Sequence, residues 1–247
     1  MEHYMPQGFA SYSNISVSAL EFNPRGQDIV QKKQEIISAI STHYNATPSS
    51  ILFIGFSPMI LSSACKNISV TGLTEDGKKY LDASGVKYIY IGADDLAQYK
   101  KAFSWVVACD EYFTFAGTEE EQRAGVEAAA DLAKDLIVTT LRDYKNQDFR
   151  DREFSQPLAV YNHKQSRLFV EHHDYDFNDK NSWTTTVYEL EGESAAIYGP
   201  FARRSMFFKQ MAKFSIDAGA KNFYVHKNLM YKSLIKKNYE HVITISF

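Results

Sequence analysis

The strongest constraint on the fold of this chain is a strand-length apolar run at residues 51–54, followed by one glycine and a helix-start signal. Every residue in the run is apolar, which is typical of strands buried on both faces of a parallel sheet. Ser57 is a favourable N-cap residue, and Pro58 suits the first helical position, where a missing N–H costs least. The segment therefore predicts a buried strand, a turn at Gly55 and a helix that begins beside the turn.

Strands and helices alternate through the first 141 residues. Each apolar run is followed by a segment with helical spacing or a helix cap, such as the capping box that Thr118 forms with Glu121. This order predicts a parallel sheet with right-handed crossovers. We expect strands at 51–54, 67–72, 86–91, 105–109 and 136–141, and helices at 28–43, from Pro58 onward, at 74–83 and at 118–134.

The pattern changes after residue 141. A charged, irregular segment leads into two strand-like runs that predict a β-hairpin, and then into a helix and two last strands around a short basic helix. We expect the hairpin at 167–171 and 184–190, the helix at 205–218, and the strands at 222–225 and 241–245. The prediction is one domain over residues 1–247, with an N-terminal extension at 1–27 and an inserted loop and hairpin at 142–200.

Composition and charge narrow the classes of function. The chain has 45% hydrophobic and 23% charged residues, and its net charge of -3 gives no general attraction to nucleic acids or anionic membranes. No segment approaches the roughly 18 apolar residues of a membrane-spanning helix, and the polar N-terminus does not resemble a secretory signal. Cys65 and Cys109 lie in or beside apolar runs, so we expect reduced thiols in a cytoplasmic protein without a membrane partner.

The order of the predicted elements resembles the class I S-adenosylmethionine (SAM)-dependent methyltransferases. Segment 54–57 falls where the glycine-rich first motif of that family lies, 70–75 resembles the second strand and its exit, and 91–96 resembles the third motif. Segment 105–113 resembles the fourth strand, whose exit faces the transferred methyl group. The resemblance implies a Rossmann-like α/β fold: a seven-stranded, mostly parallel sheet with helices on both faces, a terminal antiparallel strand and, here, an inserted β-hairpin.

The resemblance also implies a cofactor and the residues that contact it. SAM would lie with its methionine end on the first turn, its ribose at the exit of the second strand and its adenine at the third. The implied cofactor contacts are Gly55, Phe56 and Ser57 on the first turn, Thr74 and Glu75 at the ribose, Asp94 at the adenine edge, and Cys109 at the end of the fourth strand. Asp110 and Tyr112 would face the methyl acceptor as catalytic residues.

Departures from the family pattern keep a second hypothesis open. One glycine remains in the first motif, where Phe56 and Pro58 crowd the turn, and glycine is the residue that lets a backbone approach a ligand closely. Thr74 supplies a hydroxyl where the family has a carboxylate, although Glu75 follows it. The first hypothesis is a methyltransferase with a small-molecule acceptor. The alternative is a non-catalytic methyltransferase-like protein that acts in protein interaction or assembly, and a nicotinamide-dependent enzyme is weaker because Gly-x-Gly-x-x-Gly is absent.

Polar residues at two strand ends have alternative interpretations. Asp110 and Glu111 follow the fourth strand, and Arg142 follows the fifth, at the edge where open α/β sheets bind ligands. The acidic pair either lines a ligand site or forms a solvated cap. For Arg142 a structural role is favoured over a substrate contact.

Two further clusters point to chemistry that we do not favour. His172 and His173 are adjacent in a predicted strand and so point to opposite faces, which argues against a shared metal ion, and we expect no metal site. Arg203, Arg204 and the lysines and tyrosines of 226–239 have the pattern of a nucleic-acid surface. A solvated amphipathic helix is the preferred interpretation of the latter segment.

Overall fold

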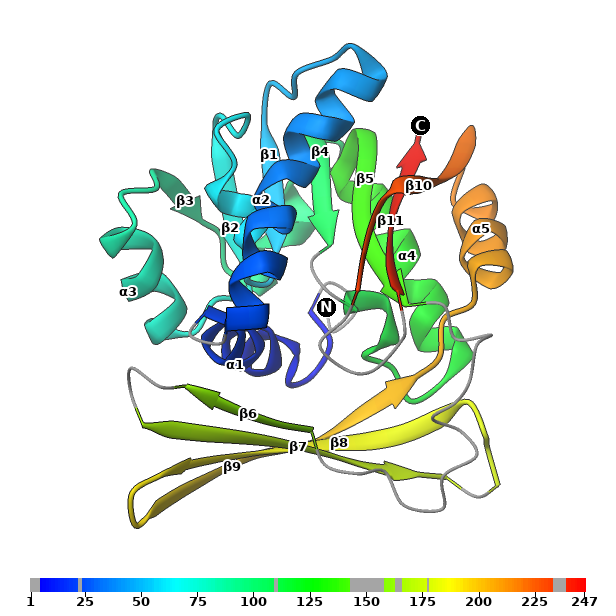
Figure 1. Ribbon diagram of the computed structural model, residues 1–247. Helices are drawn as coiled ribbons and strands as arrows, with labels where there is room; N and C mark the ends of the chain where they lie inside the picture. The colour runs from blue at the N-terminus through cyan, green and yellow to red at the C-terminus, as the bar shows by residue number, and fades with distance from the viewer. Residues whose placement is uncertain are drawn as a thin grey trace.

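The computed structural model describes residues 5–21, 24–108, 111–142, 158–162, 166–176, 178–232 and 239–247. Two sheets make up the fold, and the smaller one lies across one end of the larger (Figure 1). The main sheet contains β1 (Ile51–Ile54), β2 (Ile68–Thr71), β3 (Tyr88–Tyr90), β4 (Phe103–Ala108), β5 (Ala133–Arg142), β10 (Asn222–Lys232) and β11 (Tyr239–Ser246).

The main sheet confirms the predicted seven-stranded, mostly parallel architecture. Its strand order is β10-β11-β5-β4-β1-β2-β3. The pairs formed by β1 with β2 and β4, by β2 with β3 and by β4 with β5 are parallel. The C-terminal β11 is antiparallel to both β5 and β10, as the resemblance implied. All residues of β1, β2 and β4 are buried, which is why their sequences are continuous apolar or small-residue runs.

Helices cover the sheet, and their caps follow the sequence signals. Thr74 caps α3 through its side chain, and Thr118 forms the predicted capping box with Glu121 at the start of α4. α2 packs on η2, whereas α4 packs on α5. The helical elements are α1 (Phe9–Glu21), α2 (Pro24–Tyr44), η2 (Pro58–Leu61), α3 (Glu75–Ala83), η3 (Ala93–Gln98), η4 (Tyr112–Thr114), α4 (Glu119–Leu132) and α5 (Phe208–Asp217). Among the described residues, no helix combines the length and the hydrophobicity needed to cross a bilayer.

The helix predicted from Pro58 onward is only a single 3₁₀ turn. Ser57 caps it as expected, since its Oγ accepts the Met59 N–H at 3.4 Å. The turn ends at Ser62, which is extended and whose Oγ lies 3.2 Å from the Ser38 Oγ of α2. The turn after β1 is therefore followed by four helical residues instead of the predicted longer helix.

The predicted hairpin is the centre of a four-stranded antiparallel sheet. The strands are β6 (Leu158–Asn162), β7 (Arg167–Tyr175), β8 (Ser182–Glu191) and β9 (Ser194–Arg204), in that spatial order. β7 and β8 confirm the hairpin, but β6 and β9 were missed. β9 is exposed at most positions and contains Gly199 and Pro200, so its sequence lacks the alternation expected of a strand.

The basic helix predicted after residue 225 is wrong. β10 continues to Lys232 and pairs with β11 at Tyr231 and Lys232, after an irregularity in register. Pairing with β11 therefore prevails over the helical periodicity of the segment. Residues 233–238 lie outside the described part of the chain.

The N-terminal extension forms α1 and the start of α2. In Figure 1, α1 lies between the two sheets, at the end of the main sheet toward which β4 points. Phe9, Tyr12, Ser13 and Asn14 of α1 are buried there. The extension thus packs against both sheets in this structure.

Candidate functional site

The carboxyl edge of the parallel strands is where ligands bind in open α/β sheets, and α1 covers it. At the end of β1, Gly55 has φ +85°, and a Cβ on it would lie 2.5 Å from Phe9 Cε1. The next amide, that of Phe56, donates to Ser13 Oγ at 3.2 Å. The turn predicted to hold the cofactor is therefore in direct contact with α1.

α1 and Met5, which precedes it, fill the space beside β2 and α3. Gly72 follows β2 with φ +67°, and a Cβ there would lie 2.5 Å from Met5 Cε. A Cβ on Gly77, in the first turn of α3, would lie 1.8 Å from Asn14 Oδ1. Glycine is required at these positions because α1 and the residues before it approach the backbone closely.

The predicted cofactor residues from Gly55 to Asp94 follow β1, β2 and β3 as expected, but two of them already have structural roles. The Ser57 hydroxyl caps η2, and the Thr74 hydroxyl accepts the Gly77 N–H at 3.3 Å. The Glu75 side chain is 78% exposed and pairs with Lys78 at 2.7 Å. Asp94 is exposed in η3.

Of the remaining predicted residues, Cys109 and Asp110 lie outside the described part of the chain. Tyr112 is 1% exposed and its ring meets Phe9 edge to face, with centroids 5.2 Å apart. Tyr112 is therefore beneath α1, and it does not line an open acceptor site in this conformation.

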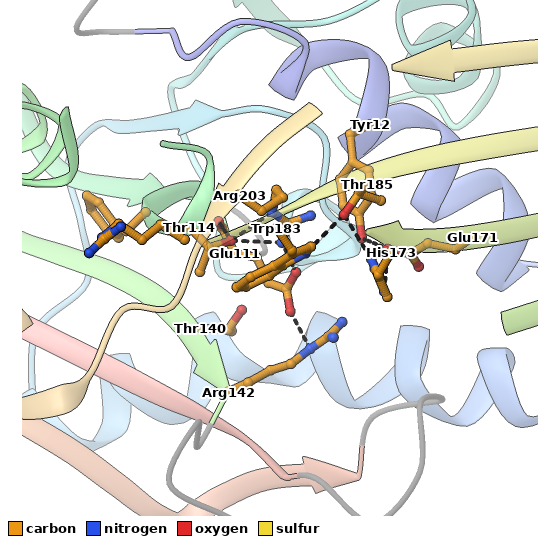
Figure 2. A network of polar contacts seen from close by, with 12 residues as sticks. Tyr12, Glu111, Thr114, Thr140, Arg142, Glu171, His173, Trp183, Thr185 and Arg203 are labelled. Atoms are coloured by element: carbon orange, nitrogen blue, oxygen red, sulfur yellow. Dashed lines mark hydrogen bonds and ion pairs between the residues drawn. The ribbon is translucent and has the colours of Figure 1, made fainter. Parts of the chain in front are cut away.

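A buried group of charged side chains connects the two sheets; we call Glu111, Arg142, Arg203 and Glu240 the charge cluster. Glu111 follows β4 in the left-handed region, with φ 59°, and its carboxylate forms ion pairs with Arg203 and Arg142 (Figure 2). Arg142 lies 3.6 Å from Glu240 of β11. Arg203 Nη2 also donates to Thr114 Oγ1 at 2.7 Å.

The charge cluster corrects two interpretations of the sequence. Glu111 is 4% exposed and is not a solvated cap. Arg203 is 1% exposed, and its guanidinium lies 4.1 Å from the Phe115 ring centroid and 4.9 Å from that of Tyr12. It therefore cannot form part of a nucleic-acid surface, whereas the structural role favoured for Arg142 agrees with its ion pairs.

Beside the charge cluster, the inner face of β7 and β8 carries a second polar group. Tyr12 of α1 donates its hydroxyl proton to Glu171 Oε1 at 2.9 Å, and His173 Nε2 lies 3.6 Å from the same oxygen (Figure 2). His173 Nδ1 lies 2.9 Å from Thr185 Oγ1, which also accepts the Trp183 indole N–H at 3.1 Å. We call Glu171, His173 and Thr185 the sheet triad.

Burial and charge determine the protonation of these groups. Burial lowers the pKa of His173 and outweighs the opposing effect of Glu171, so its imidazole is neutral at neutral pH. Burial would raise the pKa of Glu111, but Arg142 and Arg203 outweigh it and lower the pKa overall. Burial raises the pKa of Tyr12, with a further contribution from Glu171, so the phenol keeps its proton.

The sequence analysis missed Tyr12, Glu171, Thr185 and Trp183, and noted His173 only as a metal candidate. The missed signal is the period-2 alternation of β7 and β8, which places residues 171, 173, 183 and 185 on one face. His172 lies on the opposite face, as predicted. Within the described ranges, no group of three or more His, Cys, Asp or Glu side chains is arranged to hold a metal ion.

The chain has no match among protein families or curated protein sequences, but it is similar in fold to solved structures. A SAM-dependent methyltransferase from Clostridium acetobutylicum is 12% identical and covers 88% of this chain and 91% of its own, with TM-score 0.63. A sugar N-methyltransferase from a Streptoalloteichus species is 9% identical; the match covers 90% of this chain and 89% of that protein, with TM-score 0.63. A SAM-bound amino pentose methyltransferase from Micromonospora echinaspora is 11% identical; the match covers 87% of this chain and 90% of that protein, with TM-score 0.56.

At these identities the likeness concerns the fold. The strand order, the antiparallel β11 and the near-complete coverage of both chains all agree. The chain therefore has the fold of the class I SAM-dependent methyltransferases, with a four-stranded sheet across the carboxyl edge of the main sheet.

Proposed function

We propose that the protein is a SAM-dependent methyltransferase whose acceptor is a small molecule with an amino group. The observation that carries the proposal is the charge cluster, with Glu111 after β4 and Arg142 at the end of β5, together with the sheet triad of β7 and β8 beside it. Two of the structurally similar proteins are described as acting on an amino pentose and on a sugar nitrogen, which supports the acceptor class.

The residues at the carboxyl edge of the main sheet have a backbone conformation and polar groups that fit SAM, although α1 covers them. The turns at Gly55 and Gly72 have positive φ and carry no side chain. The buried Thr71 hydroxyl, at the end of β2, has no hydrogen-bond partner among the described residues. The turn at Gly55 would hold the methionine end, Glu75 the ribose and Asp94 the adenine edge. SAM would supply an already activated methyl group.

The chain's own residues would bind the acceptor and remove its proton. Among the described residues, the charge cluster and Glu171 together contain three carboxylates and two guanidiniums, and this excess of negative charge favours an acceptor with an ammonium group. An ammonium nitrogen has no free electron pair and must lose a proton before it reacts. The neutral His173 imidazole is suited to accept that proton, and positioning supplies most of the remaining acceleration.

A second candidate is the non-catalytic methyltransferase-like protein. The observation that favours it is the occupation of the carboxyl edge by Met5, Phe9 and Asn14, each of which lies where a Cβ on a neighbouring glycine would be. If α1 never leaves, neither cofactor nor acceptor can reach the site. The protein would then act through its surface.

Calorimetric titration with SAM and with its demethylated product tests the proposal. We expect micromolar binding of both ligands. Glu75→Gln should bind them several-fold more weakly, because it removes the carboxylate proposed to contact the ribose. The fold should stay intact, because Glu75 is exposed. Gly55→Val is unsuitable as a control, since its side chain would clash with Phe9 and disturb α1. Absence of binding at millimolar ligand would favour the second candidate.

The acceptor class is tested with SAM carrying a labelled methyl group. We expect transfer to small amines and much less to the alcohols of the same carbon skeleton. Preferential transfer to the alcohols would contradict the amine assignment while leaving methyl transfer intact.

A further inference from the structure

We propose that α1 is a displaceable, autoinhibitory occupant of the methyl-transfer site, with Phe9 and Ser13 in the cofactor half and Tyr12 in the acceptor half. The inference rests on the proposed function and adds a conformational step to it. Both ligands would bind only after α1 has left the carboxyl edge.

In the cofactor half, Phe9 and Ser13 take the place of a ligand. The Phe9 ring is fully buried against Gly55 and lies edge to face with Tyr112 and Phe115. Ser13 Oγ accepts the Phe56 N–H, a backbone donor that faces the edge where a ligand's polar end would lie. Apolar surface and a hydrogen-bond acceptor are thus both supplied from within the chain.

In the acceptor half, Tyr12 has the corresponding role. Its hydroxyl donates to Glu171, the carboxylate that neighbours His173, and its ring lies over the Arg203 guanidinium. The ring also meets Phe201 of β9, with centroids 6.1 Å apart. Tyr12 therefore contacts the sheet triad at Glu171 and the charge cluster at Arg203 (Figure 2).

The way α1 is attached makes its release possible without loss of either sheet. Side-chain hydrogen bonds of Ser13 and Tyr12 join it to the turn after β1 and to β7, whereas the strands of each sheet pair through their own backbones. Release of α1 would expose Gly55, which Phe9 covers, and Glu171, which bonds to Tyr12, at the same time. One movement would open both halves of the site.

Phe9→Ala and Tyr12→Phe test the inference through SAM affinity. When a ligand binds only the open state, its apparent affinity is reduced in proportion to the fraction of molecules that are open. Phe9→Ala weakens the closed state, so it should lower the melting temperature yet tighten SAM binding about tenfold or more. Tyr12→Phe, which keeps the ring, should tighten binding to a smaller extent. Phe214→Ala is the matched control, because Phe214 is equally buried in α5 and should lower the melting temperature without changing SAM affinity.

Hydrogen exchange supplies a second readout, since SAM should increase exchange of the α1 amides in the wild-type protein. Unchanged or weaker SAM binding by Phe9→Ala and Tyr12→Phe, with α1 still protected in the complex, would overturn the inference but leave the proposed function standing. Failure of the wild type and of both variants to bind SAM would overturn the proposed function as well, and α1 would then be a permanent part of the fold.

Discussion

At the scale of single residues, neighbours in sequence can have opposite environments. Arg203 is buried and bonds to Glu111 and Thr114, whereas the next residue, Arg204, pairs with Asp179 near the surface. Removing one partner of a buried ion pair leaves an uncompensated charge, whereas a surface pair contributes little.

Arg203→Met should therefore lower the free energy of unfolding by about 3 kcal/mol, and Arg204→Met by less than about 1 kcal/mol. Urea denaturation of the two variants measures both values. Equal losses would show that the charge cluster does not stabilise the junction of the two sheets.

His226 makes stability depend on pH. Burial lowers its pKa to about 4, with the neighbouring His43 adding to the effect, and its Nε2 lies 2.9 Å from Thr244 Oγ1. Below pH 6.5 the unfolded chain binds a proton that the folded His226 does not take up until about pH 4. The free energy of unfolding should thus fall as the pH drops from 6.5 to 4.

His226→Gln, whose side chain can still bond to Thr244, should make this fall shallower. Urea denaturation at several pH values measures the slope. His173, whose pKa is also lowered, contributes in the same direction and accounts for part of the slope that remains. An identical slope in wild type and His226→Gln would contradict the prediction.

At the scale of elements, the start of a helix is determined by residues close in sequence, whereas the length of a strand depends on the strand it pairs with. The capping box of α4 uses the side chains of Thr118 and Glu121, only three residues apart, so the sequence showed it directly. The extents of β10 and β9 depend instead on backbone pairing with β11 and β8, which their own residue patterns do not indicate. Elements that rest on such pairing were predicted too short or missed.

Thr118→Ala should lower the free energy of unfolding by about 1 kcal/mol, because it removes the acceptor for the Glu121 N–H. Thr118→Ser, which keeps a hydroxyl, should lower it by a few tenths at most. Guanidinium denaturation distinguishes the two variants, and equal losses would argue against the cap.

At the scale of the whole molecule, α1 and the charge cluster tie the two sheets together. Arg203 of β9 bonds to Glu111 after β4, and Tyr12 of α1 bonds to Glu171 of β7. These buried contacts should make the two sheets unfold as one cooperative unit, in keeping with the single domain predicted from the sequence.

The two tryptophans report on the unfolding of the two sheets separately. Trp105 lies in β4 and Trp183 in β8, and both are buried. Trp183→Phe and Trp105→Phe give proteins with one reporter in each sheet. Within each variant, we expect the fluorescence transition to coincide with the loss of helical circular dichroism. A fluorescence transition that precedes it in the Trp105→Phe protein would show that the small sheet unfolds independently.

Local patterns in the chain were sufficient for the parallel strands of the main sheet and for the positions where these strands end. Buried parallel strands need continuous apolar runs, as at 51–54, and helix caps need particular side chains, as at Thr74 and Thr118. Gly55, Glu75 and Asp94 could therefore be placed at the carboxyl edge from the sequence.

The occupation of that edge was decided by tertiary structure. A polar N-terminal segment carries no signal that Phe9 and Tyr12 will be buried, because both find their partners, Gly55 and Glu171, far along the chain. The burial of Arg203 likewise depends on long-range pairing with Glu111. Charge and hydrophobicity specify what a side chain requires, and only the assembled sheets specify which distant group meets that requirement.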